Sequence, residues 1–273
     1  MSRRYSIARL APVVVNDDLV GRVEVRRDPH RPTVRLLEVN GRMYGAVDLE
    51  EPANLGLGYL ARLRTVVDTL LPAGRCQIIH LGGGAFALPR ALASRRPELT
   101  QVVVERSERI IRLAEQELQL RPTASLAVVH DDARALLRSS GARSFDAVVG
   151  DAFVGRETPR HLATVEFAAD VARVLRVRGI YVVNLIDAPP WPVLAAHAAT
   201  VRTALPHLLA VAAPQTAQLR ESGNVLLVAS RRPIHRPTLE YRLDTARERM
   251  ALVPGRRLAA LADRARPRHD ADG

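Results

Sequence analysis

The sequence contains no lysine, so arginine supplies all 40 of its basic residues, against 29 acidic ones, for a net charge of +11. This absence excludes a Walker phosphate loop, because that loop needs a lysine followed by serine or threonine after its glycines. The arginines are scattered, often as pairs such as Arg95-Arg96 and Arg256-Arg257. They would attract nucleic acid non-specifically, but aromatic residues make up only 4% of the chain and leave few platforms for base stacking. We therefore do not expect a dedicated nucleic-acid-binding protein.

Cysteine and long apolar runs are also scarce. Cys76 is the only cysteine, which excludes an internal disulfide and a zinc or iron–sulfur site built from cysteines. No apolar run approaches the ~20 residues of a membrane span. The first ten residues, MSRRYSIARL, lack the apolar segment and cleavage site of a signal peptide. With hydrophobic residues at 47% and charged residues at 25%, the composition predicts a globular cytoplasmic protein with no membrane partner.

What the sequence does contain begins with a small antiparallel β unit, predicted over residues 1–52. Its strand-like segments are 13–15, 20–25, 34–39 and 42–47. Asn40-Gly41, between the last two segments, is a strong signal for a two-residue hairpin turn. A helix is predicted over 55–71 by the spacing of its apolar residues.

From residue 53 to 232, strand and helix patterns alternate. Strands are predicted at 76–81, 101–105, 126–130, 145–150, 179–185, 208–213 and 224–229. Helices are predicted at 87–95, 107–119, 131–138, 160–176 and 191–204. This alternation predicts an α/β fold with a doubly wound, mostly parallel seven-stranded sheet, whose last two strands form an antiparallel edge pair. Residues 233–273 are expected to form a basic C-terminal extension, with a helix near 256–264 and a loose tail from 266 onward.

Three consecutive glycines follow the first strand of this sheet, in IIHLGGGAFA over 78–87. Glycines in a row cost backbone entropy and are kept where a ligand or another backbone approaches closely. In an open α/β sheet the ligand binds beyond the carboxyl ends of the strands. The polar residues and glycines at those ends are therefore candidates for a nucleoside pocket: His80, Gly82, Gly83, Gly84, Glu105, Asp131, Asp132, Asp151 and Asp187. Each acid also has a simpler explanation, because acids at strand ends often cap the following helix.

Two kinds of nucleotide pocket fit this pattern. Gly82, Gly84 and Ala87 satisfy G-x-G-x-x-G/A, and Glu105 follows close to the ~20-residue distance of the ribose-binding acid in dinucleotide sites. An S-adenosylmethionine pocket uses the same turn and acid, and adds an acid after the third strand for the adenine amino group. It also ends in an antiparallel strand pair. Because Asp132 and the final strand pair supply both extra features, we favour this interpretation, with an NAD-dependent oxidoreductase as the alternative.

Several stretches resemble the spermidine synthase (polyamine aminopropyltransferase) family, and most closely its divergent bacterial members, which have a class I methyltransferase-like Rossmann fold. These stretches are LGGGAFALPRAL at 81–92, VVVE at 102–105, HDDARALL at 130–137, the segment 145–191 and GNVLLVAS at 223–230. The resemblance covers roughly residues 33–230 and includes the small N-terminal β unit. It implies that decarboxylated S-adenosylmethionine donates an aminopropyl group to a diamine. It also implies a homodimer with the β unit near the interface.

The resemblance assigns a role to each candidate residue. Gly82 and Gly84 border the sulfur end of the nucleoside, and His80 and Gly83 are assigned to the same cofactor pocket. Glu105 holds the ribose hydroxyls, and Asp132 with Ala133 takes the adenine edge. Asp151 matches the catalytic aspartate. Tyr59, Asp187 and Trp191 are assigned to the acceptor pocket.

A carboxylate at position 151 fits this chemistry. An alkyl amine has a pKa near ~10 and is protonated at neutral pH, so it cannot attack a sulfonium carbon until it loses a proton. A carboxylate within hydrogen-bond reach orients the amine and accepts that proton. Because the thioether departs as a neutral group, we expect no metal in the reaction.

The sequence departs from the family pattern at three positions. Ala85 and Val154 stand where the family has aspartates that hold the donor ammonium and the diamine, and Leu60 stands where it has a glutamine. These departures leave the acceptor open to an amine or another small molecule, and the transferred group open to aminopropyl or methyl. A catalytically altered nucleoside-binding regulatory protein is the alternative. His161 and His197 fall in predicted helices, where we expect surface or packing residues.

Overall fold

The structure is a computed structural model that describes residues 11–246 and 248–272. The first ten residues, on which the expectation of no signal peptide rests, lie outside this part. Within it, every helix is too short or too polar to cross a membrane.

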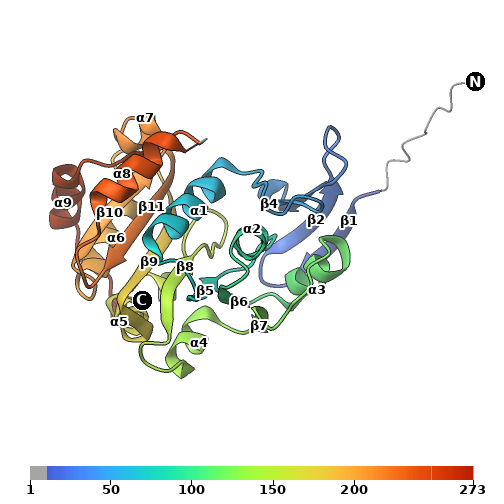
Figure 1. The fold of residues 1–273 in the computed structure, drawn as a ribbon, viewed down its shortest axis with the longest axis horizontal. Coiled ribbons are helices and arrows are strands. Elements are labelled where there is room, and N and C mark those ends of the chain that lie inside the picture. Colours follow the sequence, from blue (N-terminus) through green and yellow to red (C-terminus); the bar gives the residue numbers. More distant parts are fainter. Residues whose placement is uncertain (1–10, 247, 273) are drawn as a thin grey trace, which may run out of the picture.

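The N-terminal β unit is a separate four-stranded antiparallel sheet, as predicted. Its strands follow the chain order β1-β2-β3-β4: β1 (Val13–Asp17), β2 (Gly21–Arg27), β3 (Val34–Val39) and β4 (Arg42–Asp48). Asn40 and Gly41 join β3 to β4 with φ values of 51° and 74°, as a type I′ hairpin turn requires. The predicted hairpin is therefore confirmed. Figure 1 shows this small sheet at one end of the molecule, beside α3.

The main sheet has eight strands among the described residues, one more than predicted, in the order β12-β10-β11-β9-β8-β5-β6-β7. Its strands are β5 (Gln77–Leu81), β6 (Thr100–Glu105), β7 (Leu126–His130), β8 (Phe145–Gly150), β9 (Leu175–Asp187), β10 (His207–Ala212), β11 (Gly223–Ser230) and β12 (Ala251–Leu252). In this order, the neighbours β9, β8, β5, β6 and β7 all pair in parallel. Strand β11 is antiparallel to both β9 and β10. The mostly parallel sheet and the antiparallel pair are thus confirmed.

Helices cover both faces of this sheet. On one face lie α1 (Gly58–Leu70), α2 (Ala87–Arg95), α3 (Glu108–Glu117) and α8 (Arg236–Thr245). On the other lie α4 (Ala133–Ser139), α5 (Val165–Val174), α6 (Pro192–Arg202) and α9 (Gly255–Arg264). A four-residue helix, α7 (Pro214–Ala217), and a short 3-10 turn, η1 (Arg160–Leu162), complete the site-bearing part of the chain. Because both faces are covered, the central strands are continuous apolar runs.

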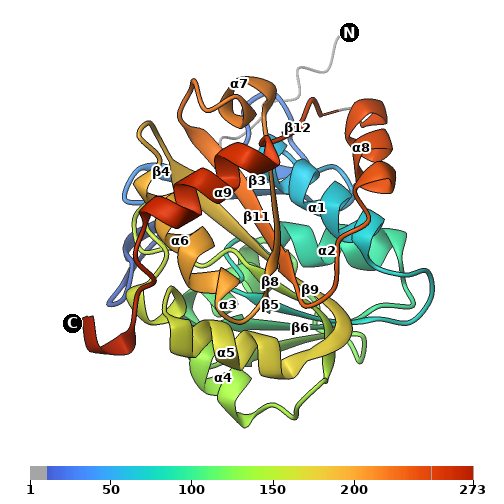
Figure 2. The same cartoon turned by 90° about the vertical axis from the view of Figure 1, so that its left-hand side faces the viewer.

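The C-terminal extension packs onto the main sheet instead of trailing from it. Helix α8 contacts α1, β12 pairs with β10, and α9 lies alongside α6 (Figure 2). The extra strand of the sheet is this β12. The prediction missed α8 because its apolar residues are few, with only Leu239 and Leu243 buried. The predicted boundaries at 52 and 232 fall in the connections from β4 to α1 and from β11 to α8.

The two sheets meet at the glycine turn. A Cβ built on Gly45 of β4 would lie 2.5 Å from the Cβ of Ala85, so only a glycine lets β4 approach this closely. The Ser107 hydroxyl donates a 2.6 Å hydrogen bond to Asp17 of β1, and the Tyr44 hydroxyl donates one of 2.7 Å to the Phe153 carbonyl. These contacts hold the small sheet over the carboxyl ends of the parallel strands.

Candidate functional site

Two adjoining cavities lie at this edge, between the small sheet and the carboxyl ends of the parallel strands. The larger has a volume of about 290 Å³ and is lined by residues of β4, α1, α2, β9 and β11. The smaller has a volume of about 80 Å³ and is lined by the ends of β6 and β7 and by the loop after β8. Five residues line both cavities: Tyr44, Gly82, Gly84, Asp151 and Phe153. We therefore treat the two cavities as the larger and the smaller compartment of one candidate site, with Asp151 at the junction between them.

Asp151 is fixed at the junction by two neutral donors. Asn184 on β9 donates from its amide nitrogen at 2.8 Å, and the Tyr59 hydroxyl on α1 donates at 3.2 Å. Burial raises the pKa of Asp151 to about 7, although both hydrogen bonds oppose the rise. Burial and the neighbouring Asp151 charge raise the pKa of Tyr59 well above its usual value, so its hydroxyl keeps its proton. Asp151 thus has the pKa of a general base for neutral pH.

The glycine turn brings the backbone against Asp151. Gly82 has φ +99°, and a Cβ there would lie 2.9 Å from the Asp151 carbonyl oxygen. Glu105, at the end of β6, accepts hydrogen bonds from the Gly83 nitrogen at 2.8 Å and from the Ser107 nitrogen at 2.9 Å. A carboxylate has about four acceptor positions, so Glu105 keeps capacity for a ligand hydroxyl. The predicted glycine residues and Glu105 are therefore brought together.

Asp132 lines the smaller cavity and caps α4. One carboxylate oxygen accepts from the Arg134 nitrogen at 2.9 Å and the Ala135 nitrogen at 3.1 Å, and the other contacts His161 Nε2 at 2.8 Å. Burial opposes ionisation, but the bonds from Ala135 and His161 outweigh it and lower the pKa of Asp132. The helix-capping explanation is thus correct for Asp132, which lines the cavity together with Asp131 and Ala133.

His161 is a site residue that the sequence analysis assigned to packing or the surface. It lies on η1 in the loop after β8 and lines the smaller cavity, where its Nε2 contacts the Asp132 carboxylate. Its position in a loop at the carboxyl edge of the sheet was the available signal. His197, by contrast, is buried on α6, and its Nδ1 contacts the Val193 carbonyl, as a packing residue should.

His80, predicted to bind the nucleoside, lines the larger cavity and not the smaller one. Its Nε2 lies 2.9 Å from Gln101 Oε1, and the Gln101 amide nitrogen donates to the Pro89 carbonyl at 3.0 Å. The Gln101 oxygen can only accept, so His80 carries its proton on Nε2. Burial lowers the pKa of His80 to about 4, so this ring is neutral at pH 7.

Asp187 and Trp191, predicted for the acceptor pocket, line neither cavity. The carboxylate of Asp187 accepts from the Ala188 nitrogen at 2.8 Å and the Leu194 nitrogen at 2.7 Å, which ties it to the start of α6. Trp191 is buried and donates from its ring nitrogen to the Leu219 carbonyl at 3.3 Å. Both residues organise the turn into α6, and their assignment to the acceptor pocket stays a prediction.

The larger cavity also has two asparagines that were not predicted from the sequence. Asn184 and Asn224 both line it, and the Asn224 amide nitrogen donates to the Asn184 oxygen at 3.1 Å. Asn224 lies at this edge because β11 runs in reverse and begins where the parallel strands end. The buried Asn184 within the apolar run of β9 was a signal in the sequence, since buried polar residues need a hydrogen-bond partner.

The three departures from the family pattern have different surroundings. Leu60 is buried and lines the larger cavity. Ala85 lines it too, but packs against Gly45 in the apolar cluster beneath the small sheet. Val154 is 55% exposed and lines the smaller cavity and not the larger. A side chain at 154 therefore does not face the larger compartment.

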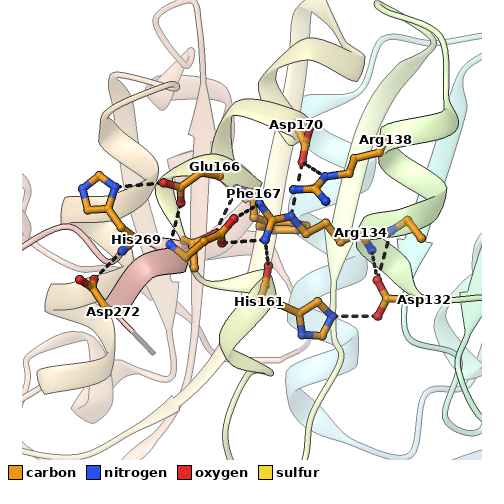
Figure 3. A network of polar contacts seen from close by, with 12 residues as sticks. Asp132, Arg134, Arg138, His161, Glu166, Phe167, Asp170, His269 and Asp272 are labelled. Carbon is orange, nitrogen blue, oxygen red and sulfur yellow. Dashed lines mark hydrogen bonds and ion pairs between the residues drawn. The ribbon is translucent and has the colours of Figure 1, made fainter.

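The wall behind Asp132 is tied to the C-terminus. Arg134, with 8% of its side chain exposed, donates two 2.7 Å hydrogen bonds to Asp270, reaches Asp170 of α5 at 3.5 Å and donates to the His161 carbonyl at 3.3 Å (Figure 3). Glu166 accepts from the Asp270 nitrogen at 3.0 Å. The prediction of a loose tail from residue 266 is wrong for residues 266–272, because these contacts hold it against α4 and α5.

Known proteins share this fold and part of this sequence. No family model matches the sequence. Polyamine aminopropyltransferase from Vibrio vulnificus (strain CMCP6) is 34% identical over 112 residues, which are 40% of this chain and 37% of that relative. A probable spermidine synthase from Corynebacterium glutamicum ATCC 13032 superposes with a TM-score of 0.85 at 24% identity, covering 96% of this chain and 97% of the other. The protein has the spermidine synthase fold.

A second solved structure supports this spermidine synthase fold at lower similarity. A spermidine synthase in complex with the transition state analogue AdoDATO has a TM-score of 0.62 at 14% identity, over 91% of this chain and 82% of the other. The resemblance drawn from the sequence is thus confirmed for the fold. The aligned sequence match is limited to little more than a third of the Vibrio relative.

Proposed function

We propose that this protein is a spermidine synthase-like transferase that moves an alkyl group from a sulfonium nucleoside to an amine. The observation that carries the proposal is the position of Asp151, which lines both cavities and is the residue at which donor and acceptor would meet. The donor is S-adenosylmethionine or its decarboxylated form, and the group that moves is aminopropyl or methyl.

In this proposal the nucleoside occupies the smaller compartment. Glu105 accepts from the ribose hydroxyls, and Asp132 with Ala133 faces the adenine edge. The compartment's volume of about 80 Å³ is below the ~300 Å³ at which small-molecule pockets usually begin. We therefore expect the loop that carries Phe153, Val154 and His161 to move outward on binding.

Asp151 acts as the general base. The amine approaches through the larger compartment as an ammonium ion and gives its proton to the Asp151 carboxylate. Its nitrogen lone pair then attacks the carbon next to the sulfonium; the new N–C bond forms as the C–S bond breaks, and the bond electrons leave on sulfur as a neutral thioether. Tyr59 and Asn184 keep the carboxylate aimed into the junction.

Calorimetric titration tests the donor assignment. We expect binding of S-adenosylmethionine, its decarboxylated form or methylthioadenosine in preference to NAD. Tightest binding of NAD would instead favour the oxidoreductase. Nucleoside binding without any transfer to an amine panel would favour the regulatory alternative.

Substitution Asp151→Asn tests the catalytic assignment. The amide keeps the shape of the carboxylate but cannot accept the proton, so transfer should fall by at least about a hundredfold while methylthioadenosine affinity stays within about threefold. Asp263→Asn, at an exposed ion pair with Arg202, is the matched control and should leave transfer unchanged. If Asp151→Asn kept its turnover, Asp151 would not be the general base.

We also propose a homodimer, on the family resemblance alone. Light scattering at micromolar concentration should give twice the 30.0 kDa chain mass. A monomer under these conditions would contradict it.

A further inference from the structure

The larger compartment has little charge on its walls. Among the described residues that line it, Asp151 is the only acid and arginine is absent. Apolar side chains make up much of the rest, among them Leu57, Leu60, Leu88 and Ile186. The wall therefore offers one negative charge, at its junction with the nucleoside compartment.

The remaining polar groups are neutral, and several of their protons are already committed. Tyr59 and Asn184 donate to Asp151, and Asn224 donates to Asn184 at 3.1 Å. The Tyr44 hydroxyl donates to a backbone carbonyl, and the neutral His80 ring donates to Gln101. Asp151, Asn184 and Asn224 thus form a hydrogen-bonded row, and the leucines and Ile186 supply apolar surface in the same lining.

We propose that the acceptor is a primary monoamine whose remaining chain is uncharged and mainly apolar, rather than a diamine or a longer polyamine. The inference rests on the alkyl transfer proposed above and names its substrate class. One ammonium group pairs with Asp151, and the chain beyond it contacts the leucines and Ile186.

The physical reason is the cost of a second buried charge. An ammonium group taken from water into a cavity without a carboxylate loses its hydration and gains only neutral acceptors. The rest of the molecule adds to this cost, because a protein of net charge +11 repels a dication more than a monocation. A methyl group at the same place is instead favoured, since it removes apolar surface from water.

Pentylamine and putrescine form a matched pair of probes, because one ends in a methyl group where the other has a second amine. Each is titrated calorimetrically at pH 8 into the protein saturated with methylthioadenosine, so the readout does not depend on turnover. We expect pentylamine to bind at least about tenfold more tightly. In the presence of decarboxylated S-adenosylmethionine, mass spectrometry should find the aminopropyl adduct of pentylamine in excess.

Putrescine binding as tightly as pentylamine, or neither amine binding to the nucleoside-loaded protein, would overturn the inference. These outcomes leave the proposed donor site intact. Failure of every sulfonium nucleoside and of methylthioadenosine to bind would instead overturn the proposed function.

The substitution Asn224→Asp tests charge as the cause. It adds a carboxylate to the larger compartment with little change in volume, and should raise putrescine affinity relative to pentylamine by about tenfold. Asn16→Asp makes the same change of charge at an exposed position on β1 and should leave the ratio unchanged. An unchanged ratio in folded Asn224→Asp, judged by circular dichroism, would overturn the charge argument.

Discussion

At the scale of single residues, the burial of Asp151 is costly for stability and is also what suits it to the proposed role as a base. Its carboxyl group is enclosed by β8, α1 and β9, and among the described residues only Asn184 and Tyr59 contribute side-chain hydrogen bonds to it. Burial therefore dominates and raises its pKa to about 7. A group that keeps its proton up to about pH 7 in the folded state, but loses it above about pH 4 in the unfolded chain, makes stability depend on pH.

Asp151→Asn should stabilise the protein at alkaline pH. In the folded protein Asp151 keeps its proton up to about pH 7, whereas in the unfolded chain it loses the proton above about pH 4. The free energy of unfolding of the wild type therefore falls as pH rises from about 4 to about 7. The amide has no such dependence. Urea unfolding should show the variant more stable than the wild type by up to about 4 kcal/mol at pH 8, and by clearly less at pH 5. A difference that does not change with pH would show that Asp151 has an ordinary pKa.

Tyr59→Phe should move the pH profile of transfer to higher pH. The hydroxyl favours the ionised carboxylate, so its loss should raise the pKa of Asp151 from about 7 to about 8, and activity at pH 7 should fall by about fivefold or more. Tyr241→Phe, at an exposed position, is the control. An unshifted profile in Tyr59→Phe would show that the hydroxyl does not act on Asp151.

At the scale of elements, the glycine turn and Glu105 act as one unit. The end of β6 lies beside the end of β5 because the two strands pair in parallel. Glu105 therefore reaches the Gly83 nitrogen and, through Ser107, the start of α3. This geometry connects the smaller cavity to the small sheet, since Ser107 also donates to Asp17.

Glu105→Gln should weaken methylthioadenosine binding by about tenfold to a hundredfold, because bonds from the ribose hydroxyls to a charged acceptor are worth about 1.5–3 kcal/mol each. The loss should appear in calorimetric titration with the fold intact by circular dichroism. Glu108→Gln, on the exposed side of α3, should bind normally. Unchanged affinity in Glu105→Gln would show that Glu105 only supports the turn.

At the scale of the whole molecule, the C-terminal residues pack against the elements that line the smaller cavity. Arg134 connects α4, α5, η1 and the C-terminal residues, which are far apart in sequence. Glu166 and His269 add a contact of 3.1 Å to the same region (Figure 3). The C-terminal segment therefore supports the wall that carries His161 and Asp132.

Arg134→Met should lower the free energy of unfolding by about 2 kcal/mol. Breaking a fully buried ion pair costs about 3–5 kcal/mol. We expect a smaller loss here because 40% of the Asp270 side chain is exposed. Arg138→Met is the matched control: it also contacts Asp170, but 57% of its side chain is exposed, and its loss should cost less than about 1 kcal/mol. If both variants lost the same free energy of unfolding in urea, Arg134 would not be the residue that holds the C-terminal segment in place.

Local sequence determined most of the secondary structure. The strand and helix periods, the Asn40-Gly41 turn and the run of three glycines act through neighbouring residues, so they can be read from one segment at a time. The acids at strand ends could also be predicted to gather, because the carboxyl ends of parallel strands share one edge of the sheet. In this way Glu105, Asp132 and Asp151 were found, and the pocket tyrosine Tyr59 followed from the family resemblance.

Tertiary structure alone decided which of those acids face the site and which partners surround them. Asp187 follows the same sequence rule as Asp151, but its carboxylate turns to the backbone at the start of α6. Tyr44 enters the site because the small sheet packs over the glycine turn, and Asn224 enters because β11 runs in reverse. Arg134 meets Asp270 across 136 positions of sequence. Side-chain direction and long-range pairing depend on packing between distant segments, and no local pattern encodes them.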